Sequence, residues 1–425
     1  MAIVPGWDAS SARAAAGAGR DCCVDGSADA TGDHDVWVPV DLHTHADFCD
    51  DVHHTAAELS QQMETAGLGA ASVLLWGNWK NDLAYLTGLD DSVSTPSRLV
   101  HFDVEISGFQ AATGGHLLLL GLPPSAGPEV WLEPYSYPGG SGIPIVETGF
   151  GRLAALRGMA HTWTWPADGT FPSPPLGCCM ALELPVHVAR GGIDFLSTEY
   201  DFDVPETSGS LVVWERLLDS GFKVPFAPAS DFSCLQSRVG ALRSWVMIRG
   251  ALSYSAVLGA VKAGRVVAVA DDSPRWLDLR VHGARLGDTI NVTSGKPLDL
   301  EVESDQPVEG LLRIVVNGQS VHEETLPAGK QTRRVSLVVD RSAWIRASIP
   351  KATTSPVYVT VDGAPIRPSA DAPCYFMRYI DQLSGLVDSR AVDVGPDTDV
   401  ALQGYAEARK VFETRFREAG GTNCP

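Results

Sequence analysis

The sequence contains no apolar run approaching the roughly 20 residues that a membrane-spanning helix needs. Its longest runs, such as Leu117–Leu120 with its neighbours, are far shorter. The N-terminus has no basic start followed by an apolar stretch, so no signal peptide is visible and we expect a cytoplasmic protein. A GxSxG elbow, a P-loop and a GxGxxG fingerprint are also absent, which disfavours serine hydrolases and nucleotide-binding proteins.

Basic residues are scarce relative to acidic ones. The 425 residues include 32 Lys and Arg against 52 Asp and Glu, which gives a formal net charge of −20. Nucleic acids and anionic membranes would repel such a surface, so we expect neither as a partner. A negative surface suits a protein that collects divalent cations and acts on a small-molecule substrate. Whether the chain forms a homo-oligomer stays open.

Cysteine is present, but its spacing indicates no framework. The eight cysteines form two adjacent pairs and four singles: Cys22, Cys23, Cys49, Cys178, Cys179, Cys234, Cys374 and Cys424. This pattern matches neither a secreted disulfide framework nor CxxC zinc spacing. We therefore expect these cysteines to be small buried residues rather than parts of disulfides.

The chain divides into four predicted regions. Residues 1–34 are rich in Ala, Gly, Ser and Asp without periodicity, and we expect a flexible segment. In residues 35–272 short β-rich runs alternate with helical patterns, which predicts an α/β domain with a mainly parallel sheet arranged as a barrel. Closely spaced strands in residues 273–367 predict a small antiparallel β-sandwich. Residues 368–425 form a predicted tail with two helices, over 371–390 and 400–419.

His43 and His45 stand one residue apart at the end of the predicted strand Val36–Leu42. Because side chains alternate along a strand, we expect both imidazoles to point to the same face. Two imidazoles at the carboxyl end of a strand suit a divalent metal, and active sites of α/β barrels lie at that end. An HxH triplet occurs often by chance, so further ligands are needed.

Polar residues recur beside other predicted core strands, which include Leu99–Ile106, Ile193–Thr198 and Val224–Ala229. The residues in such positions, or in the loop after the two histidines, are Asp50, Glu105, His116, His161 and Asp231. Burying so many polar groups separately costs free energy unless they have partners. A shared metal site would account for all of them together.

This set resembles the PHP (polymerase and histidinol phosphatase) superfamily of metal-dependent hydrolases, and more narrowly its CehA/McbA-like group. The first family motif, DLHTH followed by an acidic residue, matches residues 41–50, and residues 74–78 are similar to the second motif of the group. The later family ligands fall on Glu105, His116, His161 and Ser230-Asp231. The resemblance covers about residues 36–418. It implies a distorted (β/α)7-type barrel, followed by a small β-sandwich and C-terminal helices.

The resemblance implies one or two divalent ions, of zinc, manganese or iron, and hydrolysis by an activated water. The implied metal ligands are His43, His45, Asp50, Glu105, His161 and Asp231. Asp231 and His116 are the implied catalytic residues, with Asp231 as a proton acceptor for the water. Alternatively, His116 binds metal or substrate, and Asp50 only orients a ligand histidine. Trp76 and Ser233 stand where many relatives have ligand histidines, so we expect fewer than three ions.

Tryptophans near the proposed ligands predict an apolar or aromatic substrate. Trp76, Trp163 and Trp165 are the candidate contacts, although core packing is the ordinary role of any one tryptophan. Arg238 follows Asp231 and suits a phosphate or carboxylate, with a structural ion pair as its alternative role. We therefore predict a metal-dependent hydrolase of a carbamate, ester or amide-type bond. The alternatives are a phosphoesterase and a non-catalytic ligand-binding protein with a degenerate metal site.

Overall fold

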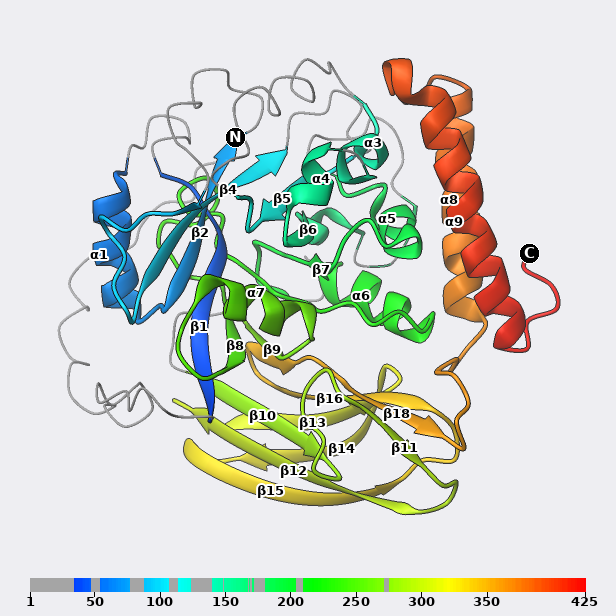
Figure 1. Ribbon diagram of the computed structural model, residues 1–425. Helices are drawn as coiled ribbons and strands as arrows, with labels where there is room; N and C mark the ends of the chain where they lie inside the picture. Colours follow the sequence, from blue (N-terminus) through cyan, green and yellow to red (C-terminus); the bar gives the residue numbers. More distant parts are fainter. Residues whose placement is uncertain are drawn as a thin grey trace, which may run out of the picture.

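The computed structural model describes most of the chain after residue 33 (Figure 1). The described residues are 34–46, 54–76, 88–106, 114–123, 140–147, 149–166, 168, 170–171, 180–203, 209–270 and 275–425. The predicted flexible segment 1–34, apart from His34, lies outside them, as do Asp50 and the predicted domain boundary at 272–273.

A large mixed sheet forms the centre of the α/β region (Figure 1). Six of its strands are neighbours in the same order as in the chain. They are β1 (Asp35–Thr44), β2 (Ala70–Trp76), β4 (Leu99–Ile106), β5 (His116–Leu120), β6 (Leu156–Ala160) and β7 (Phe195–Leu196). The short strand β3 (Gly88–Leu89) pairs with β4. On the other side of β1 lie β8 (Arg243–Arg249) and then β9 (Val266–Val269).

The prediction of a mainly parallel sheet is wrong. β1, β2 and β4 are parallel to one another, but β5 is antiparallel to both β4 and β6, and β8 is antiparallel to β1. The connection from β4 to β5 is short, which suffices for an antiparallel pair, whereas a parallel pair needs a crossover of about a dozen residues or more. β8 is missing from the predicted strands, because the buried Arg243 and Ser244 obscure its apolar pattern.

No strand pairing that closes this sheet into the predicted barrel is present among the described residues. The segment 224–232, predicted in part as a strand, makes isolated parallel bridges instead. Phe226 pairs with Leu196 of β7, and Phe232 pairs with Thr44 of β1. This segment therefore contacts both β7 and β1.

The helices of this region are α1 (Ala56–Ala66), α3 (Gly142–Glu147), α4 (Gly149–Leu153), α5 (Leu184–Arg190), α6 (Ser210–Asp219) and α7 (Tyr254–Lys262), with the 3₁₀ turn η2 (Thr162–Thr164). α1 shows how local sequence sets the ends of an element. Glu58 N donates to the Thr55 side chain (3.2 Å), and Thr55 N donates to the Glu58 carboxylate (2.9 Å). This capping box starts the helix, and Gly67 ends it in the left-handed conformation. The buried Leu59 joins the same core cluster as Val73 of β2.

The β-rich region after residue 275 has two layers. A small antiparallel sheet contains β10 (Trp276–Val281), β12 (Pro297–Gln306) and β15 (Gly329–Val338). The other layer continues the large sheet with β11 (Thr289–Val292), β13 (Gly310–Val316), β14 (Gln319–Leu326), β16 (Ala343–Ile349), β17 (Ala352–Thr354) and β18 (Val357–Val361). Leu298, Leu300 and Val302 alternate along β12 into a core shared with Ile345 of β16. Pairing of β17 with β9 makes one sheet continuous through both regions.

Two long helices end the chain, α8 (Asp371–Asp388) and α9 (Thr398–Glu418), with the short turn η3 (Gly395–Asp397) between them. They confirm the helices predicted over 371–390 and 400–419. Figure 1 shows them side by side against the α/β region, and the rings of Phe376 and Phe412 join them at a centroid distance of 4.9 Å. None of the helices among the described residues, these two included, is long and apolar enough to cross a membrane.

Three cysteines contradict the prediction made from their spacing. Cys374 of α8 and Cys424 form a disulfide, and Cys234 is disulfide-bonded as well. Cys374 and Cys424 are 50 residues apart, and spacing along a chain does not determine which cysteines meet in the fold. Stable disulfides are typical of oxidising compartments, so the cytoplasmic location stays a prediction that these bonds do not support.

Candidate metal centre

The carboxyl end of β1 is joined by hydrogen bonds to a segment 189 residues further along the chain. The pairing register of β1 with β2 shifts just after Asp41, which marks a bulge at the end of the strand. The Asp41 carboxylate accepts hydrogen bonds from Ser230 N (3.0 Å), Ser230 Oγ (2.5 Å) and Gly240 N (2.7 Å). Asp231 N donates to His43 O (2.8 Å). These hydrogen bonds bring the side chains of His43 and Asp231 together at the end of β1.

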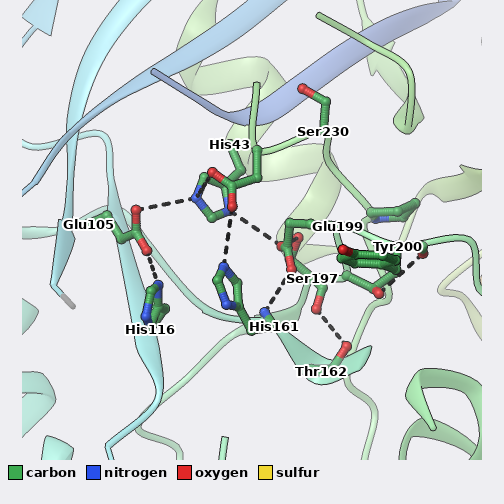
Figure 2. A network of polar contacts seen from close by, with 12 residues as sticks. His43, Glu105, His116, His161, Thr162, Ser197, Glu199, Tyr200 and Ser230 are labelled. Carbon is green, nitrogen blue, oxygen red and sulfur yellow. Dashed lines mark hydrogen bonds and ion pairs between the residues drawn. The ribbon is translucent and has the colours of Figure 1, made fainter. Parts of the chain in front are cut away.

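The predicted imidazole pair of His43 and His45 meets a carboxylate from β4. His43 Nε2 lies 3.3 Å from Glu105 Oε2, and His45 Nε2 lies 3.2 Å from the same oxygen. The second oxygen of Glu105 contacts Nδ1 of His116, the first residue of β5. The antiparallel pairing of β4 with β5 makes this contact possible. Glu105 therefore lies between the imidazole pair and His116, and Figure 2 shows it between His43 and His116.

His161 and Asp231 join the cluster from two turns. Their φ angles are 58° and 49°, a left-handed conformation that non-glycine residues seldom adopt and that clusters at functional sites. Asp231 Oδ1 lies 3.1 Å from His45 Nε2 and 3.3 Å from His43 Nε2, and its other oxygen lies 3.4 Å from His161 Nε2. The predicted site residues that the structure brings together are His43, His45, Glu105, His116, His161 and Asp231.

A seventh member of the cluster, Glu199, is absent from the sequence-based prediction. It lies in the turn after β7, where its Oε1 is 3.3 Å from His43 Nδ1 and its Oε2 accepts a hydrogen bond from His161 N (2.8 Å). Ser197 Oγ donates to Oε1 (2.7 Å). The sequence signal is an acidic residue directly after the predicted strand Ile193–Thr198, since the other candidate ligands also lie in or next to predicted strands.

The seven side chains are almost completely buried, and their charges depend on one another. Burial disfavours protonation of His43 and His45, but the carboxylates of Asp231 and Glu105 outweigh this effect. They raise the pKa of His43 well above its usual value and the pKa of His45 to about 9. Burial also opposes ionisation of the two carboxylates, yet the histidines around them hold the pKa values of Glu105 and Asp231 well below their usual range. Both carboxylates are therefore ionised at neutral pH, as metal ligands must be.

These side chains form three overlapping groups whose ligand atoms lie within 4.8 Å of one another: His43–His45–Asp231, Glu105–His116–His161 and His43–His161–Glu199. Within the described part of the chain, His161 Nε2 and Asp231 Oδ1 are buried and make no hydrogen bond of acceptable geometry. Buried polar atoms without hydrogen bonds cost about 1–3 kcal/mol each, and a cation between them would remove that cost. Imidazole and carboxylate donors suit zinc, manganese and iron, so the residues present fit a divalent ion.

The predicted aromatic substrate contacts have different surroundings. Trp163 in η2 is half-buried, and its ring centroid lies 5.9 Å from that of His161 and 4.5 Å from that of Tyr200. Tyr200, which is 44% exposed, is absent from the sequence-based prediction. Trp165 is only 3% exposed, and its indole N–H donates to Tyr375 Oη of α8 (3.2 Å). Trp163 and Tyr200 therefore border the cluster, whereas Trp165 packs against the C-terminal helices.

Of three further predicted residues, two are placed only in part and one lies outside the described residues. Trp76 ends β2 as the register partner of Glu105, and its side chain lies outside what the structure describes. The side chain of Arg238 is exposed, in the segment between Asp231 and β8. Asp50 lies outside the described residues altogether. The roles of these three stay predictions.

No protein-family model matches the chain, and no curated protein sequence matches it. The chemistry of the buried cluster is therefore what points to a function. Its histidine and carboxylate side chains come from several strand ends and turns, and together they can hold a metal ion.

Proposed function

We propose that this protein is a metal-dependent hydrolase of the PHP superfamily, similar in its order of motifs to the CehA/McbA-like group. The observation that carries the proposal is that motif residues dispersed along the chain meet in one buried cluster. These residues are His43, His45, Glu105, His116, His161 and Asp231. Burying so many ionisable groups together is costly unless a cation offsets the negative charge and takes up the imidazole nitrogens.

The strand arrangement supports the same proposal. We infer that the large sheet curves into the distorted barrel of this superfamily, with the segment 224–232 in the position of a strand between β7 and β1. The parallel bridges Leu196–Phe226 and Thr44–Phe232 support this position. Active sites of α/β barrels lie at the carboxyl ends of their parallel strands, and the ends of β1, β4 and β6 contribute to the cluster.

Two of the ligand groups, His43–His45–Asp231 and Glu105–His116–His161, would each bind one ion. The protein would then hold one ion or two. A bound divalent ion polarises the bond under attack and lowers the pKa of water. The residues around these ligands orient them and exclude bulk solvent from them, because all of the ligand side chains are buried.

Three residues have further roles in this proposal. Glu105 connects the two ligand groups, since its two oxygens face different histidines. Asp231 is better suited to act as a metal ligand than as a proton acceptor, because its pKa lies well below the usual range and its carboxylate binds protons weakly. Burial, together with the neighbouring His161, lowers the pKa of His116, so its neutral ring is the better proton acceptor of the two when the group Glu105–His116–His161 holds no ion.

The surroundings of the cluster favour a substrate with a flat apolar or aromatic group. Trp163 stands beside His161, and its ring centroid lies 4.5 Å from that of the exposed Tyr200. Trp163 Nε1 is buried and has no hydrogen-bond partner among the described residues. An aryl carbamate, ester or amide combines such a ring with a carbonyl group.

A PHP-type phosphoesterase is the second candidate. It is favoured by the exposed Arg238 between Asp231 and β8, because a guanidinium suits a phosphate group. A non-catalytic ligand-binding protein is the third candidate, since Trp76 replaces a ligand histidine of many relatives.

Metal analysis of the purified protein, followed by a panel of aryl carbamates, esters, amides and phosphate monoesters, tests the proposal. We expect bound zinc, manganese or iron and turnover of a carbamate, ester or amide. His43→Ala should lose both metal and turnover, while His322→Ala, on β14, should keep both. Turnover of phosphate monoesters alone would favour the second candidate. A protein that neither retains nor rebinds metal would overturn the proposal.

A further inference from the structure

We propose that Glu199 is a positioning residue, which holds the ring of His43 and the turn at His161 in the geometry that binds an ion. The inference rests on the proposed function, because it assigns a role within the same site. Figure 2 shows the Glu199 carboxylate between His43, His161 and Ser197. The Glu199 side chain is fully buried, so these neighbours determine its orientation.

The two ring nitrogens of His43 face different carboxylates. Nε2 lies 3.3 Å from both Glu105 Oε2 and Asp231 Oδ1. Nδ1, on the other side of the ring, lies 3.3 Å from Glu199 Oε1. An ion bound through Nε2 is therefore out of reach of Glu199, whose role is to accept a hydrogen bond from Nδ1–H. Such a bond keeps the proton on Nδ1 and directs the lone pair of Nε2 at the metal.

Glu199 also holds a second histidine of the centre, through the backbone. Its Oε2 accepts a hydrogen bond from His161 N (2.8 Å), at a residue whose φ of 58° lies in the left-handed region. Ser197 Oγ donates to Oε1 (2.7 Å) and stabilises the orientation of the carboxylate. One buried carboxylate thereby connects the ends of β1, β6 and β7.

The hydrogen-bond pattern requires a carboxylate at this position. Each oxygen faces a different donor, His43 Nδ1 on one side and His161 N on the other. A glutamine has one acceptor oxygen and one NH₂ group, so one of these two donors would face another donor. Glu199→Gln therefore keeps the size of the side chain and breaks one of its two connections.

The test measures Zn²⁺ affinity by chelator competition in wild type, Glu199→Gln and Glu183→Gln. Glu183 is equally buried, but its partners are Ser141, Gly142, His187 and Tyr405, so its variant controls for the loss of a buried carboxylate. Loss of the hydrogen-bond partner of a ligand histidine lowers metal affinity about 10–100-fold. We expect that loss for Glu199→Gln and unchanged affinity for Glu183→Gln. Unfolding curves of the metal-free variants establish that each is folded.

Nitrogen-15 histidine NMR of protein loaded with ¹¹³Cd²⁺ separates positioning from a purely structural role. In wild type we expect one-bond cadmium coupling at His43 Nε2 and a proton on His43 Nδ1. In Glu199→Gln we expect the Nδ1 proton signal to shift or to exchange faster with solvent. A structural role alone would leave this signal unchanged wherever the variant is folded.

The outcomes distinguish this inference from the proposed function. Cadmium coupling at His43 Nδ1, or equal Zn²⁺ affinity in wild type and Glu199→Gln, would overturn the role of Glu199 and leave the proposed function standing. Wild type that binds neither Zn²⁺ nor Cd²⁺ would overturn the proposed function, and the role of Glu199 with it.

Discussion

Trp163 and Trp165 stand two positions apart in the sequence, yet their neighbours belong to different parts of the molecule. Trp163 lies beside His161 of the metal-ligand cluster, whereas Trp165 stacks on Tyr379 of α8 with ring centroids 4.7 Å apart. Both residues are equally good candidates for substrate contact from the sequence. Only the position of α8 separates their roles.

Trp165→Ala should lower the free energy of unfolding by about 3–5 kcal/mol, because it leaves a cavity where a buried aromatic ring packed against α8. Trp163→Ala should lower it much less, since Trp163 is only half-buried, but should raise KM for an aromatic substrate. Denaturant unfolding and steady-state kinetics measure the two effects. Equal losses of stability in both variants would contradict this division of roles.

The charge of the ligand histidines predicts how metal binding depends on pH. Burial lowers the pKa of His45 in the metal-free protein, but Asp231 and Glu105 outweigh it and raise the pKa to about 9. Below that pH an ion must displace a proton, so apparent Zn²⁺ affinity should rise between about pH 6.5 and pH 9. Chelator competition at several pH values, with proton release in weak buffer, measures this rise. A flat profile across this range would refute the linkage.

The same pKa shift predicts the stability of the metal-free protein. The pKa of His45 in the folded protein lies above its value of about 6.5 in the unfolded chain. Protonation of His45 therefore stabilises the fold, and this contribution is fully present below about pH 6.5. This contribution should disappear as the pH rises through about 9. Thermal unfolding in the presence of a chelator should therefore show a falling midpoint from about pH 6.5 to pH 9. His45→Asn should flatten that part of the profile.

At the scale of elements, the end of β1 depends on the carboxylate of Asp41. Asp41→Asn keeps the size of the side chain but places an NH₂ group against the N–H groups of Ser230 or Gly240. A buried donor left without an acceptor costs about 1–3 kcal/mol, and we expect that loss in the free energy of unfolding. Zn²⁺ affinity should fall too, because the same hydrogen bonds place His43 and Asp231.

Asp299→Asn provides the comparison for this variant, because Asp299 lies on an exposed position of β12. Denaturant unfolding and chelator competition should show little change for it. Unchanged stability and affinity in Asp41→Asn would mean that the end of β1 does not depend on this carboxylate.

At the scale of the whole molecule, a buried polar network fastens the C-terminal helices to the α/β region. Glu183, before α5, accepts hydrogen bonds from Tyr405 Oη of α9 (2.6 Å) and from Ser141 Oγ (2.7 Å). The disulfide between Cys374 and Cys424 ties the end of the chain back to α8. Trp165, which follows the turn at His161, connects that turn with α8.

Cys424→Ser should lower the free energy of unfolding by about 4 kcal/mol, because the bond closes a loop of 50 residues and its loss restores entropy to the unfolded chain. Denaturant unfolding with and without a reducing agent measures the effect. The reducing agent should destabilise wild type more than Cys424→Ser, which lacks this bond and keeps, among the cysteines that the structure describes, the disulfide of Cys234. Identical responses of the two proteins would contradict a stabilising role of this bond.

Much of the centre follows from the sequence because its ligands occupy recognisable local positions. Glu105 stands near the end of an apolar run, Leu99–Ile106, whose predicted bounds coincide with those of β4. His43 and His45 lie at the end of a strand with readable alternation, and His161 follows another. The C-terminal helices are equally readable, since helical periodicity persists over many residues.

Other features depend on which elements meet, and spacing along the chain carries little of that information. The sequence by itself determined that several histidines and carboxylates adjoin strand ends, because the period of side chains in strands is local. The tertiary structure alone decided that β5 runs antiparallel to β4, that Glu199 reaches His43, that Trp165 packs on α8 and that Cys374 bonds Cys424. Each of these contacts joins segments whose approach results from packing across the whole fold, and so no local pattern encodes it.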